Sequence, residues 1–273
     1  MSSRRKRRGA KLLIALALAL ICVAPFALSQ KLIVREYEMR SPKLRAPHRF
    51  AVVSDLHNSF YGPRQRELAQ AILDSGADAL LLLGDMADSY AELGGALALL
   101  EELNGALPVY SVSGNHECAY KSERLRIEDA LRNAGAHLLK GECARLGEIC
   151  VAGVDDPLAC TRAEWRAQIE DVRGDPEEFT LLLCHRPERV AESAQGFDLA
   201  LSGHTHGGQI RIPGLLNGLW APNQGWFPRY AGGRYALDAG ELIVSRGLEK
   251  SWIPRVFNRP ELVIVQLSPE RAA

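Results

Sequence analysis

The chain has 273 residues, of which 47% are hydrophobic and 24% are charged, and these proportions are those of an ordinary folded globular body. Its 33 basic residues balance its 33 acidic ones, but six basic residues lie within the first eleven positions, which leaves 27 basic against 33 acidic residues in the remainder. This excess of acidic residues in the remainder of the chain excludes specific nucleic-acid binding as a leading hypothesis. It also indicates that the basic N-terminus is a targeting feature.

The first predicted element is an apolar run from Leu12 to Leu28, which follows the basic cluster. As a helix it spans about 25 Å, slightly less than a typical hydrocarbon core. Residues 1–29 therefore predict an uncleaved signal anchor, with a signal peptide cleaved near Ser29 as the alternative. Because the basic residues precede the apolar run, both alternatives place the rest of the chain outside the cytoplasm.

After a polar connector at 30–48, the main folded domain is expected at 49–268, followed by a tail at 269–273. Its first half alternates short apolar runs with amphipathic segments, which predicts strands alternating with helices. The expected strands are 49–54, 79–83 and 109–112, and the expected helices are 63–74, 92–103 and 121–133. Polar residues follow each strand, as in an α/β layer whose site lies along one sheet edge.

The second half is richer in predicted strands, which favours two sheets packed as a sandwich. It begins with a hairpin, 142–145 and 148–154, expected to turn at Leu146-Gly147. The later expected elements are a helix at 163–172, strands at 179–184, 198–202, 241–245 and 261–267, and a long loop at 213–233.

Five short motifs stand at the ends of predicted strands and hold five of the seven histidines. They are Asp55-x-His57, Gly84-Asp85, Gly114-Asn115-His116, His185 and Gly203-His204-x-His206. Each residue alone is more easily explained as a cap, a turn or a buried histidine. Together they form a nitrogen and oxygen ligand set without thiolate, which suits Mn, Fe, Co or Zn.

This set of motifs resembles the calcineurin-like metallophosphoesterases from about Phe50 to about Leu267. Within that family it is most similar to the membrane-associated bacterial branch. That closer likeness is carried by the segments 54–58, 203–211, 221–225 and 258–261. The resemblance implies a four-layer α/β/β/α sandwich and a single-pass protein of the bacterial cell membrane, exported instead if the N-terminal segment is cleaved.

The resemblance also implies two divalent metal ions bridged by Asp85. One ion would take Asp55, His57 and His206, and the other would take Asn115, His185 and His204. A hydroxide shared by the two ions would attack phosphorus. His116 would not bind metal, but would protonate the leaving group as the general acid.

The expected function is therefore hydrolysis of a phosphomonoester or phosphodiester, with a lipid-linked ester as one candidate substrate. The alternative is a non-catalytic, metal-bound scaffold associated with the membrane, but such a scaffold would not need His116. The sequence does not indicate the oligomeric state.

Three further features give weaker predictions. Cys143 and Cys150 would face each other across the hairpin, where a disulfide and two free thiols are both open. The pair Asp155-Asp156 is interpreted as a loop feature. Apolar residues in the 213–233 loop would either pack in the core or line a groove for a lipid tail; they are Leu215, Leu216, Leu219, Trp220, Trp226, Phe227 and Tyr230.

Overall fold

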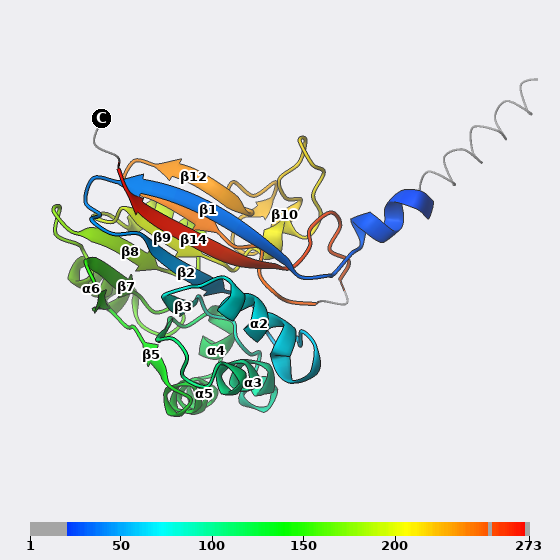
Figure 1. The fold of residues 1–273 in the computed structure, drawn as a ribbon, viewed down its shortest axis with the longest axis horizontal. Helices are drawn as coiled ribbons and strands as arrows, with labels where there is room; N and C mark the ends of the chain where they lie inside the picture. The colour runs from blue at the N-terminus through cyan, green and yellow to red at the C-terminus, as the bar shows by residue number, and fades with distance from the viewer. Residues whose placement is uncertain (1–20, 251–252, 271–273) are drawn as a thin grey trace, which may run out of the picture.

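The architecture is a pair of six-stranded mixed sheets packed face to face between two layers of helices (Figure 1). The computed structural model describes residues 21–250 and 253–270. In spatial order the first sheet is β1 (Ile33–Ser41), β14 (Glu261–Pro269), β2 (His48–Val53), β3 (Ala79–Leu82), β4 (Val109–Ser111) and β5 (Ala136–Leu138). The second sheet is β12 (Gly233–Leu237), β13 (Gly240–Val244), β9 (Leu199–Ser202), β8 (Phe179–Leu183), β7 (Ile149–Gly153) and β6 (Glu142–Leu146).

Helices cover the outer faces of both sheets. The first sheet is covered by α2 (Arg66–Asp74), α3 (Gly94–Leu103) and α5 (Lys121–Asn133). The second is covered by α6 (Arg162–Asp171) and α7 (Pro187–Ser193), and the short α4 (Asn115–Cys118) follows β4. The four-layer α/β/β/α sandwich expected from the sequence is confirmed.

The run of leucines in β3 shows how the layers are held together. Successive side chains of a strand point to opposite faces, so Leu80 and Leu82 pack against the helices while Leu81 packs between the sheets. All three are buried. A strand buried on both faces must be apolar throughout, which is why this segment is a continuous hydrophobic run rather than an alternating one.

Parallel pairing places the strand ends that carry the motifs at one edge. β2, β3 and β4 are parallel neighbours in the first sheet, and β8 and β9 are parallel neighbours in the second. The loops that follow these strands therefore emerge at the same end of the sandwich.

Three expected elements differ from the structure. The stretch 30–48, expected as a connector, contains the nine-residue edge strand β1. The helix expected from 63 is a 3₁₀ turn, η1 (Pro63–Gln65), followed by α2, because Arg64 and Gln65 have positive φ angles of 55° and 64°. The loop at 213–233 contains the small hairpin of β10 (Trp220–Ala221) and β11 (Gly225–Trp226).

The hairpin of β6 and β7 is shifted relative to the predicted register. Leu146 pairs with Ile149, so the turn lies at Gly147-Glu148 and not at Leu146-Gly147. Cys143 consequently lies opposite Ala152 rather than opposite Cys150. The two cysteines still share a face, and they form a disulfide with their Cα atoms 5.7 Å apart.

Loss of this disulfide should lower stability without changing the fold. Replacing Cys143 by serine should reduce the free energy of unfolding by about 2–3 kcal/mol, because the bond restricts the unfolded chain. Denaturant unfolding should show that reductant destabilises the wild type to the level of the variant and leaves the variant unchanged. Cys160→Ser, at an unbonded cysteine, serves as the control; an equal effect of both substitutions would contradict the assignment.

Most of the apolar run at the N-terminus lies outside the described residues, including positions 12–20. Residues 21–27 are helical and project from the body (Figure 1). Within the described part of the chain, no helix is both long enough and apolar enough to cross a bilayer.

Candidate metal centre

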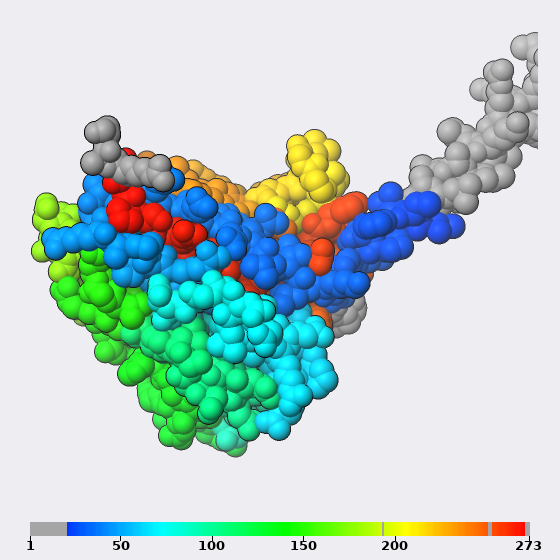
Figure 2. All heavy atoms as spheres, in the orientation of Figure 1, coloured from blue at the N-terminus to red at the C-terminus, as the bar shows by residue number. Residues whose placement is uncertain are grey.

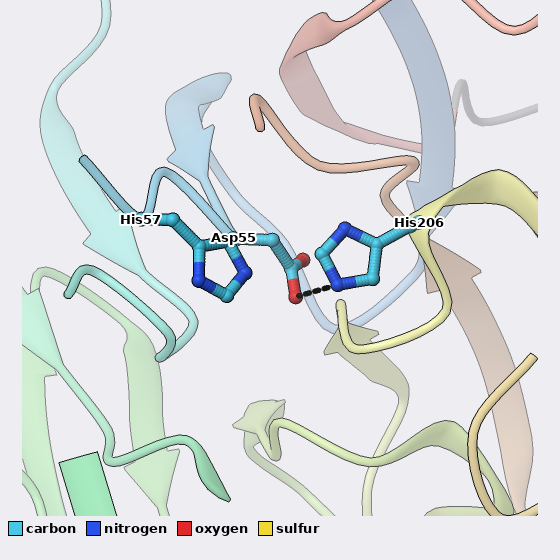
Figure 3. Close-up of side chains that lie close together, drawn as sticks. All are labelled: Asp55, His57 and His206. Carbon is cyan, nitrogen blue, oxygen red and sulfur yellow. Dashed lines mark ion pairs between the residues drawn. The ribbon is translucent and has the colours of Figure 1, made fainter. Parts of the chain in front are cut away.

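The structure brings all eight predicted site residues to one edge of the sandwich. The ligand atoms of Asp55, His57 and His206 lie within 4.8 Å of one another (Figure 3), and so do those of Asp85, His185 and His204. The remaining two predicted residues contact the second group: Asn115 Oδ1 lies 3.2 Å from His185 Nε2, and the main-chain N–H of His116 donates to Asp85 Oδ1 at 2.9 Å.

The backbone at the site is held in an uncommon conformation. Asp55, His57, Asp85, His204 and His206 all have positive φ angles, between 47° and 70°. Non-glycine residues adopt this region at a cost of about 1–3 kcal/mol, and such residues cluster at functional sites. Main-chain bonds stabilise it here, since His57 N–H donates to the Asp85 carbonyl at 3.0 Å.

Two glycines allow the loops to approach the carboxylates. A Cβ atom on Gly114 would lie 2.2 Å from Asp85 Oδ1, and one on Gly203 would lie 2.4 Å from Asp55 Oδ2. Any larger residue would displace the carboxylates, which explains the glycines of the motifs Gly114-Asn115-His116 and Gly203-His204-x-His206.

His185 shows why the second cluster attracts a cation. Its Nδ1 lies 2.7 Å from the Leu83 carbonyl oxygen, which can only accept, so Nδ1 must carry the proton of a neutral ring. Nε2 then presents a lone pair to Asp85 Oδ2 and Asn115 Oδ1, each 3.2 Å away. Three electron-pair donors that face one another at this distance need a positive charge between them.

The other histidines repeat this arrangement. His57 Nδ1 is 2.6 Å from Asp88 Oδ1, which leaves the buried Nε2 with no hydrogen-bond partner among the described residues. His206 Nδ1 is 3.1 Å from Glu249 Oε2, and its Nε2 faces Asp55 Oδ1 at 3.8 Å (Figure 3).

In His204 the roles of the two ring nitrogens are exchanged. Nε2 donates a hydrogen bond to Asn223 Oδ1 at 2.7 Å, so Nδ1 is the nitrogen whose lone pair is available to a metal. A second partner that fixes the tautomer is typical of metal-ligating histidines. The donor set, its orientation and its unpaired buried atoms therefore fit two adjacent divalent cations.

The carboxylates raise the affinity of the site for positive charge. Burial alone would lower the pKa of His185, but the neighbouring Asp85 outweighs it and raises that pKa to about 10. Burial would also lower the pKa of His57. The bond to Asp88 and the charges of Asp85 and Asp55 outweigh burial and raise that pKa to about 9. His204 differs, since burial and the nearby His185 lower its pKa to about 4. Protons therefore occupy part of this site when no cation does.

His116 lies at the mouth of the site, and 44% of its side chain is exposed. Its Nδ1 is 2.6 Å from Asp88 Oδ1, so Asp88 contacts both His116 and His57. The bond to Asp88 raises the pKa of His116. The bond to Asp88 therefore favours the protonated form of this half-exposed imidazole, which can donate a proton to an oxygen bound at the site.

Sequence reasoning missed several residues that support the ligands. Asp88 could have been found from its spacing in Asp85-Met86-Ala87-Asp88, but Glu249 and Asn223 carry no local signal. Glu117, which is buried, accepts from the main-chain N–H groups of Asp85 at 2.9 Å and Gly114 at 3.0 Å, and so ties two of the site loops together.

The pair Asp155-Asp156 is more than a loop feature. Both oxygens of Asp156 bind the buried guanidinium of Arg186, at 2.5 and 2.9 Å. Arg186 Nη1 also donates to Asn223 Oδ1 at 3.0 Å, which is the oxygen that binds His204. The aspartate therefore supports a ligating histidine indirectly.

Comparison with known proteins agrees with this site. A family model, calcineurin-like phosphoesterase, matches residues 48–208. An uncharacterized metallophosphoesterase of Aquifex aeolicus (strain VF5) is 31% identical over 250 residues, which cover 86% of this chain and 91% of that protein. The phosphodiesterase YaeI of Escherichia coli (strain K12) is 27% identical over 230 residues, which cover 81% of this chain and 83% of YaeI.

Proposed function

Because the chain belongs to the calcineurin-like phosphoesterases, which are hydrolases acting on phosphoester bonds, we propose that it is a two-metal phosphohydrolase that cleaves a phosphodiester or a phosphomonoester. The observation that supports two ions most strongly is the orientation of the ligands. Two separate groups of histidine lone pairs and carboxylate oxygens face inward, and Asp85 lies where the groups meet.

The two cations would be Mn, Fe, Zn or Co, since imidazole and carboxylate ligands without thiolate suit these metals. Asp55, His57 and His206 would hold one, and Asn115, His185 and His204 the other, with Asp85 shared between them. When bound, the cations supply an acidified water and neutralise charge on the phosphoryl oxygens.

The chain's own contribution to bond cleavage comes from His116. Its exposed ring can reach a phosphoester placed over the clusters, and the bond to Asp88 favours the protonated form of the ring by raising its pKa. We infer that His116 binds a phosphoryl oxygen and transfers its proton to the leaving oxygen as the P–O bond breaks. Asp88 orients the ring and stabilises its positive charge.

A phosphodiester is the preferred substrate class, which the name of the relative YaeI supports. A lipid-linked ester is also supported by the 213–233 loop. Trp226 and Phe227 are 69% and 68% exposed, whereas core packing would have buried them; only Tyr230 of the aromatic residues there is buried. Exposed aromatic side chains beside a catalytic site can contact a lipid tail.

We also propose that the protein is anchored in the bacterial cell membrane by residues 1–29, with its catalytic domain outside the cytoplasm. The six basic residues before the apolar run support this orientation. The Cys143–Cys150 disulfide supports an oxidising compartment.

A substrate and metal panel tests the activity directly. The purified chain is treated with a chelator, reloaded with one metal at a time, and assayed on an aryl phosphodiester, an aryl phosphomonoester and a lipid pyrophosphate. We expect no turnover after chelation and recovery with a transition metal, fastest on the diester. Full activity in the chelated protein would contradict the proposal.

A further inference from the structure

A cavity that contains none of the candidate metal ligands lies where the chain enters the body from residues 21–30. It encloses about 340 Å³. Its lining residues are Phe26, Ile33, Arg35, Arg211, Pro213, Arg246, Phe257 and Arg259. Four of these are arginines, none is acidic, and none belongs to the candidate metal centre.

The positive charge of this arginine pocket is only partly compensated. The buried Glu261 binds Arg35 Nε at 3.0 Å and lies 3.4 Å from Arg246 Nε, so one carboxylate serves two guanidinium groups. Among the described residues, Arg259 donates to the main-chain carbonyls of residues 31 and 32, and these contacts neutralise no charge. Four positive charges against one negative charge leave an excess of three, which favours an anionic ligand.

Arg211 shows where that ligand would bind. Its Nη2 donates to Asn217 Oδ1, but its buried Nη1 has no hydrogen-bond partner within the described part of the chain. Burial and the neighbouring Arg246 lower the pKa of Arg211 to about 10. A guanidinium with an unpaired nitrogen and a like-charged neighbour favours a phosphate oxygen as its acceptor.

Exposed apolar side chains flank the pocket on both sides. On the N-terminal segment Phe26 is 76% exposed, and on the adjoining loop Leu215 is 82% exposed. The Phe257 N–H donates to the Ala27 carbonyl at 2.7 Å, which fixes the N-terminal segment beside the pocket. Figure 2 shows this segment, in blue, next to the orange-red residues before β14, with the yellow loop at the same end of the molecule.

We propose that the arginine pocket binds the phosphate headgroup of an anionic membrane phospholipid. The phosphate would contact Arg211 and Arg246, while the apolar side chains on either side enter the acyl region of the bilayer. A basic pocket with an apolar rim has the chemistry of a membrane interface. A free anion, in contrast, would contact the charges and would not use the rim. The bound lipid would hold this end of the domain against the membrane.

Binding of short-chain lipids to the full chain in non-ionic detergent tests this proposal. Isothermal titration is performed with dioctanoyl phosphatidylglycerol, dioctanoyl phosphatidylcholine and inorganic phosphate. The variants are Arg211→Gln, the conservative Arg211→Lys, and Arg166→Gln as a control at an exposed arginine on α6. A fourth, Asp85→Ala, disables the metal centre and prevents hydrolysis of the lipid.

We expect one site at which phosphatidylglycerol binds at least about tenfold more tightly than either phosphatidylcholine or phosphate. Arg211→Gln should weaken the binding of phosphatidylglycerol about tenfold or more, as expected for loss of a charged hydrogen bond, and Arg211→Lys should weaken it less. Asp85→Ala and Arg166→Gln should leave it unchanged. Equal affinity for the two lipids, equal affinity for phosphate, or no effect of Arg211→Gln would overturn the proposal.

Discussion

Asp85→Ala should remove metal from the protein and lower kcat/KM by at least about a thousandfold. Each tenfold step corresponds to about 1.4 kcal/mol, and in the proposed arrangement both metal positions would lose a charged ligand at once. The measurement is metal content by elemental analysis together with steady-state hydrolysis of an aryl phosphodiester. The reason is structural, since Asp85 is fully buried at the point where the two ligand groups meet.

Two control variants separate this effect from a general loss of charge or fold. Asp85→Asn keeps the size of the side chain and an oxygen that can accept from His116 N–H, but removes the negative charge. It should retain the fold while still binding metal poorly. Asp129→Asn, at an exposed acid on α5, should match the wild type in both readouts. Wild-type metal content in Asp85→Ala would refute the shared-ligand role.

His116→Ala should keep both metals and lose about 10²- to 10⁴-fold in rate, which is the usual contribution of a general acid. The loss should depend on the leaving group. An alkyl phosphodiester needs its leaving oxygen protonated, whereas an aryl diester with a weakly basic leaving oxygen needs this much less. Steady-state rates on a matched pair of alkyl and aryl diesters check the prediction.

Asp88→Asn tests the contact that orients His116. Asp88 contacts both His116 and His57, so its loss should disturb orientation and slow the alkyl diester by less than His116→Ala does. If the alkyl and aryl diesters lost rate equally in His116→Ala, the proton-donor role would be wrong, and binding of the phosphoryl group would remain as its function.

Much of the fold follows from local patterns in the sequence. The leucine run at β3 and the helix over Lys121–Asn133 were predictable, because continuous burial and helical periodicity are encoded within each segment. β1 was not predictable from local patterns, because its side chains alternate between half-buried and exposed. Its partner strand, β14, also lies more than two hundred residues later, where Glu261 pairs with Ile33. An edge strand of this kind resembles a polar connector until the sheet forms.

The break before α2 has a tertiary cause as well. Gln65 is buried and its side chain bonds Tyr61 N–H at 2.8 Å, the Ser59 carbonyl at 2.7 Å and the Gly95 carbonyl at 3.1 Å. These contacts stabilise a positive φ angle that helix periodicity cannot reveal.

The candidate site divides in the same way. The inward-facing ligands lie in short motifs at strand ends, so topology alone brings them together. The outer partners Glu249 and Asn223 come from loops whose paths depend on packing, and each contributes one oxygen to one histidine. No local spacing marks such residues, although Asn223 fixes which ring nitrogen of His204 is free and Glu249 lies 3.1 Å from Nδ1 of His206.

The central claim is that two cations lie at this edge, with Asp85 between them. Anomalous diffraction from crystals of manganese-loaded protein measures it most directly. Two peaks are expected, one among Asp55, His57 and His206 and one among Asn115, His185 and His204, both next to Asp85. A single peak, or peaks away from these side chains in an active preparation, would contradict the account.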